Sequence, residues 1–148
     1  MSHPPLDPDR QTEVRRVFGE AAFINDVGYR LTGLGPGWLE SALDIAPRHC
    51  QHHGFIHAGV QATMADHTAG SAATTLLAEG EAVLTAEFKI NLLRPAKGAL
   101  LTCRAKVLKP GRRLVVAESE VFTGEGSGRT LVSKAMVTLA VVPLPNAV

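Results

Sequence analysis

The stretch AGVQATMADHTAGSAATTLLAEG, residues 58–80, decides the fold of this chain. It contains no proline and is rich in alanine, leucine and methionine, which predicts one long helix over residues 57–79. Gly80 follows, and glycine readily adopts the left-handed conformation that commonly ends a helix. Small and apolar residues lie on most sides of the predicted helix, so we expect other elements to surround it.

The sequence after this helix alternates between apolar and polar residues, which is typical of strands. VLTAEFKINLL, residues 83–93, is the clearest example. One face is predicted to carry Leu84, Ala86, Phe88, Ile90 and Leu92, and the other Thr85, Glu87, Lys89 and Asn91. Further strands are predicted at 99–108, 113–123 and 129–142, joined by short turns that favour antiparallel neighbours. A helix followed by such strands indicates an α+β fold with a segregated helix.

Two elements are predicted before the central helix. Residues 9–24 suit a short amphipathic helix, and residues 28–47 suit a hairpin of two short strands around a Gly-Pro-Gly turn. The apolar stripe of the amphipathic helix consists of Val14, Val17, Phe18 and Phe23. We expect a single domain over residues 1–148, with residues 1–25 as an amino-terminal helical extension.

The composition argues against several classes of protein. Lys and Arg number 15 against 14 Asp and Glu, and this net charge of +1 gives no reason to expect a nucleic-acid partner. We find no apolar run of membrane-spanning length, and the start, MSHPPLDPDR, lacks the pattern of an export signal. Cys50 and Cys103 show no C-x-x-C spacing and favour a reducing compartment. These features predict a cytoplasmic protein without a membrane or nucleic-acid partner.

Asp66 is the first candidate for chemistry. It is the only formal charge between Ala58 and Ala78, and burying a carboxylate is costly unless it is paired or used. One interpretation is a structural ion pair with an Arg or Lys of a neighbouring strand. The other is a catalytic carboxylate.

The start of the helix is the second candidate. The first N–H groups of a helix have no internal partner and lie at the positive end of its dipole, so those after His57 could hold an oxyanion. Ala58 and Gly59 would let a carbonyl approach closely, although they equally suit an ordinary helix start. His57 and Asp66 are nine positions apart, which sets them on opposite faces, about 13 Å apart along the axis. They cannot form a dyad within one helix, so cooperation would require an oligomer or a later helix start.

Metal and phosphate sites are weakly supported. The run RHCQHHGFIH, with four histidines, holds no carboxylate, and its proline and glycine neighbours favour a loop without helical spacing. The glycine clusters GLGPG and GEGSG lack the residues that follow a phosphate loop. We predict no metal. The basic residues at the strand turns could be solvated charges or an anion site.

Three separated segments resemble one known family. QHHGFIHAGVQATMAD, LTAEFKINLLRPAKG and VLKPGRR occur in this order and resemble the hotdog-fold acyl-CoA thioesterases of the phenylacetate-pathway (PaaI-like) type. The likeness covers about residues 50–142. It implies a long central helix wrapped by a curved antiparallel sheet, in a homodimer or homotetramer with active sites at the subunit interface.

The resemblance also implies roles for single residues. Asp66 matches the catalytic carboxylate, which acts from the partner subunit as a general base on water or as a nucleophile. The backbone N–H of Ala58, with Gly59 beside it, matches the oxyanion donor. His57 matches the histidine that orients this loop. Ala58 stands where the family usually has glycine, which implies a narrower approach for the acyl group.

The remaining matches concern water and coenzyme A. Gln51 stands where the family has Asn or Gln, which positions the water or the carbonyl, and Thr85 matches a Ser or Thr near the nucleophilic water. Arg94, Lys109 and Arg112 are the candidates for the phosphates of coenzyme A, which enters as part of the substrate and not as a cofactor. Such a site needs no metal, because a carboxylate, an oriented water and backbone dipoles suffice for a thioester.

Two other functions remain open at the level of sequence. One is a hotdog enoyl-CoA hydratase, which adds water to a double bond instead of releasing a thiol. The other is a non-catalytic acyl-CoA-binding module, in which Asp66 would be dispensable.

Overall fold

The computed structural model describes residues 5–144, so that residues 1–4 of the predicted extension and residues 145–148 lie outside it. The helices are α1 (Pro8–Glu20), α2 (Ala22–Val27) and α3 (Ala58–Thr74), with 3-10 turns η1 (Pro47–His49) and η2 (Gly126–Gly128). The strands are β1 (Arg30–Gly35), β2 (Trp38–Asp44), β3 (Glu81–Leu92), β4 (Leu100–Pro110), β5 (Leu114–Thr123) and β6 (Thr130–Pro143). No helix of the described range has the length and apolar character needed to cross a bilayer.

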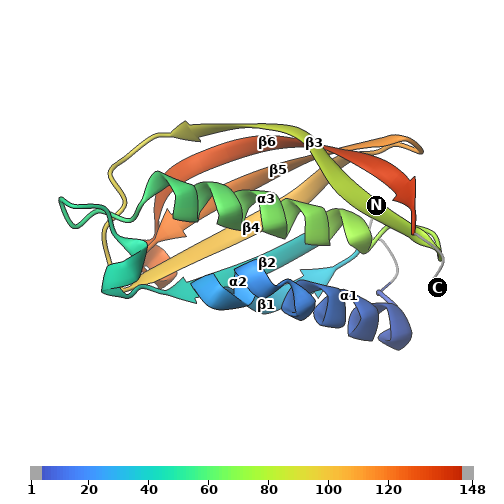
Figure 1. Cartoon of the computed structure of the whole chain (residues 1–148), viewed down its shortest axis with the longest axis horizontal. Coiled ribbons are helices and arrows are strands. Elements are labelled where there is room, and N and C mark those ends of the chain that lie inside the picture. The colour runs from blue at the N-terminus through green and yellow to red at the C-terminus, as the bar shows by residue number, and fades with distance from the viewer. Residues whose placement is uncertain (1–4, 145–148) are drawn as a thin grey trace.

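A curved antiparallel sheet wraps around the long helix α3 (Figure 1). Within the described residues it has six strands in the order β1-β2-β4-β5-β6-β3. The four strands from the carboxyl-terminal half confirm the predicted strands within a few residues. The predicted hairpin is confirmed as β1 and β2, and Gly37 in its turn has φ +74°, which glycine adopts without strain.

Helix α3 packs its small side chains against the concave face of the sheet. Met64, Ala65, Ala69 and their neighbours are almost fully buried. A hydrogen bond also joins helix and sheet here, since the Ser119 hydroxyl of β5 donates to the carbonyl of Ala65 at 2.7 Å. The small residues let the sheet approach the helix backbone closely, and other elements surround the helix as predicted.

The predicted carboxyl end of the central helix, residue 79, is wrong. The last residues tighten into i→i−3 hydrogen bonds after Thr74, and the hydroxyl of Thr75 accepts the N–H of Gly37 at 2.7 Å. This contact fastens the helix end to the β1–β2 turn. Gly80 has φ +79°, so the predicted left-handed glycine is present, but it ends the turn after the helix.

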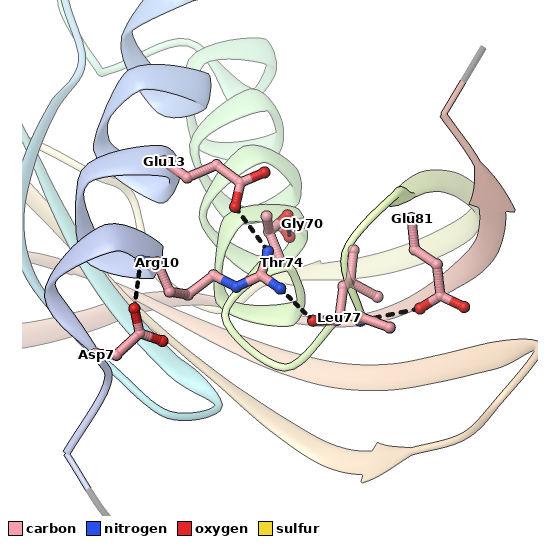
Figure 2. Close-up of polar contacts among 8 residues, drawn as sticks. Asp7, Arg10, Glu13, Gly70, Thr74, Leu77 and Glu81 are labelled. Atoms are coloured by element: carbon pink, nitrogen blue, oxygen red, sulfur yellow. Dashed lines mark hydrogen bonds and ion pairs between the residues drawn. The ribbon is translucent and has the colours of Figure 1, made fainter. Parts of the chain in front are cut away.

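The amino-terminal extension also holds this end of α3. The guanidinium of Arg10 donates to the carbonyl of Leu77 at 2.6 Å and pairs with Glu13 at 2.8 Å (Figure 2). Asp7 accepts the backbone N–H of Arg10 and caps α1. The Leu77 carbonyl is thereby satisfied by a side chain from α1.

A single helix over residues 9–24 is wrong. Ala21 has an extended conformation (φ −70°, ψ 107°) that separates α1 from α2. The break changes the rotational phase of the chain, so Ile24 turns inward and Phe23 is 64% exposed. Of the predicted stripe, the buried members are Val14 and Phe18, and the exposed members are Val17 and Phe23.

Strand β3 forms one edge of the sheet, because within residues 5–144 it pairs with β6 alone. Its ladder shifts register between Thr85 and Glu87, which marks a β-bulge. The bulge breaks the predicted alternation: Val83 and Ile90 both pack against the core although one number is odd and the other even. The predicted assignment of Thr85 to the face opposite Ile90 is therefore wrong.

Candidate active site

The amino-terminal end of α3 presents one free backbone donor. His57 is the N-cap of the helix, and its Nδ1 accepts the N–H of Gly59 at 2.8 Å. The N–H of Ala58 donates to no acceptor among residues 5–144, and Ala58 is exposed. A free N–H at the positive end of a helix dipole is suited to hold an oxygen that gains negative charge.

Gly59 leaves room for the His57 ring. A Cβ at this position would lie 3.0 Å from His57 Nδ1 and 3.4 Å from its Cε1. A larger residue would therefore press on the imidazole that caps the helix. Of the two backbone donors considered from the sequence, the N–H of Gly59 is therefore bound to His57, and the N–H of Ala58 remains available for a substrate oxygen.

A cavity of about 560 Å³ lies in front of this helix end. It brings together four of the sequence-predicted site residues: Gln51, His57, Ala58 and Arg94. The side-chain carbonyl of Gln51 accepts the backbone N–H of His53, which holds the amide in place. Most of the remaining wall is apolar and includes Phe55, Ile56, Leu92, Leu93, Pro95 and Ala96.

Asp66 lies away from this cavity, as the helical geometry predicted. It is half-buried on the side of α3 that faces β3, where the hydroxyl of Thr85 donates to Asp66 Oδ1 at 2.8 Å. Within residues 5–144 no cationic side chain reaches the carboxylate within 4.0 Å. The structural ion pair considered from the sequence is therefore wrong. The bulge in β3 is what turns Thr85 toward Asp66.

The basic candidates do not converge within one chain. Arg94 borders the cavity at the start of α3, and its Nη1 donates to the carbonyl of Leu131 at 2.8 Å. Arg112 borders a separate cavity of about 650 Å³ beside Leu77, at the other end of α3. Lys109 is exposed near the end of β4.

The histidines of the loop do not form a metal cluster. Within the part of the chain that the structure describes, no three Asp, Glu, His or Cys side chains come together as metal ligands would. The rings of His52 and His53 contact each other with centroids 4.0 Å apart and planes tilted by 48°. His49 is buried and bonds to backbone groups.

Two residues next to the candidate site were missed by the sequence analysis. Gln61 is 4% exposed, borders the cavity, and donates weakly to the carbonyl of Ile56 at 3.4 Å. Its position four residues after His57 would have revealed it, because residues i and i+4 share a helix face. His67 packs on the ring of Phe18, and burial lowers the pKa of its imidazole.

Comparisons with known proteins identify the family and agree with the fold. Residues 53–129 match the thioesterase superfamily. The crystal structure of a thioesterase family protein from Silicibacter pomeroyi is 35% identical, covers 90% of this chain and 98% of its own, and superposes with a TM-score of 0.87. A thioesterase from Haemophilus influenzae is 25% identical, with 90% of each chain covered and a TM-score of 0.80.

The fold is also that of the PaaI protein from the phenylacetic acid degradation operon of E. coli. That structure is 17% identical, covers 95% of this chain and 99% of its own, and has a TM-score of 0.82. These findings confirm the hotdog fold and the family expected from the three sequence segments. The chain belongs to the thioesterase superfamily and is a hotdog-fold enzyme that hydrolyses acyl thioesters.

Proposed function

We propose that this enzyme is an acyl-CoA thioesterase in which the N–H of Ala58 holds the oxyanion and Asp66 of the partner subunit drives the attack. The free Ala58 N–H carries the proposal, because it combines an unpaired donor, the positive end of α3 and a cavity with apolar walls. His57 orients this donor through its bond to the neighbouring Gly59 N–H.

The proposed reaction adds water to the thioester carbonyl. Asp66 takes a proton from the water as it attacks, or attacks the carbonyl itself to form an anhydride that water then hydrolyses. In the first route a tetrahedral oxyanion forms against the Ala58 N–H. It then collapses with cleavage of the carbon–sulfur bond, and coenzyme A leaves as a thiolate that takes up a proton. Gln51 positions the water or the carbonyl, and Thr85 fixes the carboxylate through its 2.8 Å bond.

Two subunits are needed because Asp66 and Ala58 lie eight positions apart on one helix, which separates them by about 12 Å along its axis. The free edge of β3 supports a homodimer, since Leu84, Phe88 and Leu92 are 63%, 40% and 52% exposed on this edge strand. A twofold antiparallel pairing centred on Phe88 would set Thr85 opposite the partner's Asn91. That register would bring the Asp66–Thr85 pair toward the cavity that Leu92 borders in the partner. A tetramer could add further contacts to this dimer.

The same pairing accommodates coenzyme A. Arg94 and the pair Lys109 and Arg112 lie at opposite ends of α3, so in the proposal they meet the phosphates of one substrate from two protomers. The apolar walls of the cavity would take the acyl group. We propose that no metal or cofactor takes part and that the enzyme works in the cytoplasm, where the thiols of Cys50 and Cys103 stay free.

The proposal is tested with Asp66→Asn and a panel of aromatic and medium-chain acyl-CoA esters, with a thiol reagent that detects released coenzyme A. The variant should lose about 10²- to 10⁴-fold in kcat while folding and assembly are unchanged. Asp26→Asn, which neutralises an exposed carboxylate on α2, is the matched control and should keep full activity.

The outcome separates the three functions. Tight acyl-CoA binding without turnover by the wild type would indicate a binding module, and water addition to an enoyl-CoA without thiol release would indicate a hydratase. Normal turnover by Asp66→Asn would refute the assigned role of Asp66.

A further inference from the structure

His49 forms hydrogen bonds to three backbone segments beside the active site: the end of α2, the turn at Ala46 and the start of α3 at His57. Its side chain is buried, its Nδ1 lies 2.9 Å from the N–H nitrogen of Ala46, and its Nε2 lies 2.7 Å from the carbonyl of Val27. A backbone N–H can only donate, so Nδ1 must be the acceptor and the ring proton must reside on Nε2, where it is donated to the Val27 carbonyl. Arg48 Nε also lies 3.2 Å from Nε2, and in this tautomer that contact joins two donors and is not a hydrogen bond. The neutral imidazole in this single tautomer therefore satisfies the N–H of Ala46 and one of the last carbonyls of α2 at once.

The backbone of His49 continues this connection into the site. Its carbonyl accepts the N–H of His57 at 2.9 Å. Between these two residues, Cys50 and Ile56 form a β-bridge, and the N–H of Gln51 donates to the carbonyl of Phe55 at 2.8 Å. The loop that carries Gln51 and His57 is thus a narrow antiparallel pair that begins at His49.

We propose that His49 is a positioning residue for thioester hydrolysis: its imidazole anchors the loop 49–57 to the end of α2 and so fixes the direction of the Ala58 N–H. The inference rests on the proposed role of Ala58 as the oxyanion donor. His49 does not border the cavity and acts through His57, whose backbone it holds at the N-cap position. Arg48 donates to the same Val27 carbonyl at 3.1 Å and keeps part of the tether when the imidazole is changed.

The test replaces His49 by side chains that keep none or one of its two hydrogen bonds. His49→Phe keeps a ring but loses both bonds, His49→Asn places an amide oxygen near the position of Nδ1, and His49→Gln places an amide nitrogen near the position of Nε2. We expect His49→Phe to lower kcat by about 10²-fold, because small displacements of a catalytic donor have effects of this size. KM should change by less than about threefold, because the donor acts mainly in the transition state. His49→Asn and His49→Gln should each recover part of kcat.

Nitrogen NMR of the wild type provides a measurement that does not depend on a variant folding. It should show His49 with a protonated Nε2 and an unprotonated Nδ1. In the folded Asn and Gln variants, the amide signals of Ala58 and Gly59 should shift. Ser41→Ala is the control for a general loss of stability, since it removes a buried hydrogen bond of 2.7 Å to Thr68 that lies outside the loop 49–57, and it should leave kcat unchanged.

The proposal is overturned if folded His49 variants keep kcat within about twofold of the wild type, or if the Ser41→Ala control loses as much kcat at equal stability. The opposite tautomer in the NMR spectrum would also overturn it. Asp66→Asn distinguishes this failure from that of the proposed function: if it abolishes turnover while the His49 variants remain active, only the role of His49 is wrong.

Discussion

Replacing Ala58 by proline removes one backbone donor from the active site and little else. Ala58 is the first residue of α3, where proline is well tolerated because its φ suits the helix and its missing N–H serves no internal bond. The residue before a proline must be extended, and His57 already has φ −59° and ψ 139°. The substitution should therefore leave the helix intact.

The expected loss follows from the hydrogen bonds at this helix end. The N–H of Gly59 is taken by His57 Nδ1, so the N–H of Ala58 is the free donor, and the variant keeps no equivalent. Loss of one oxyanion donor lowers kcat by about 10²- to 10³-fold, or roughly 3 to 4 kcal/mol. The assay is thiol release from an acyl-CoA ester at saturating substrate, with circular dichroism and thermal melting to confirm the fold.

Ala58→Gly is the matched control, because it keeps the N–H and removes only the methyl group. It should keep kcat and accept bulkier acyl groups, since the methyl narrows the approach to the helix end. A folded Ala58→Pro enzyme with a kcat within about threefold of the wild type would refute the oxyanion role.

Three further predictions concern the neighbours of the site. Thr85→Val removes the hydrogen bond to Asp66 with little change of side-chain volume. It should lower kcat about tenfold at a nearly unchanged melting temperature. An unchanged kcat would show that Thr85 does not assist the Asp66 carboxylate. Phe88→Lys places like charges near the proposed twofold axis and should yield an inactive monomer by light scattering, whereas an intact active dimer would contradict the β3 pairing. Burial lowers the pKa of His67, so the unfolded chain binds its proton more tightly and the stability falls as the pH drops below the ordinary histidine value. His67→Phe should flatten the fall in melting temperature between about pH 7.5 and about pH 5.5, and identical curves would exclude this group as a source of acid sensitivity.

Much of the fold was predictable because its determinants are local. The absence of proline and the small residues after His57 predicted the central helix, and period-two alternation predicted the strands that follow. The opposite orientation of His57 and Asp66 followed from helical geometry alone. The early end of α3 was not predictable, because the contact from Gly37 to Thr75 spans 38 residues.

The site was harder to predict from the sequence, because its contacts also join residues that are far apart along the chain. The bulge after Thr85 reverses the alternation of β3, and a single strand sequence gives no direct sign of it. The alternation of β3 alone therefore places Thr85, which donates a hydrogen bond to Asp66, on the wrong face of the strand, whereas the family resemblance identifies Thr85 as a site residue. The two bonds of the His49 imidazole depend on α2 and on the turn at Ala46, which only the folded chain brings together.

In the proposed enzyme each active site takes Ala58 from one subunit and Asp66 from the other, and subunit mixing tests this arrangement directly. Ala58→Pro and Asp66→Asn enzymes, each nearly inactive, are unfolded together in equal amounts, refolded, and assayed for thiol release, with native mass spectrometry to count hybrid dimers. Half of the dimers should be hybrids with one intact site out of two, so the mixture should regain about one quarter of wild-type activity. Hybrid dimers that form and remain inactive would contradict a shared site.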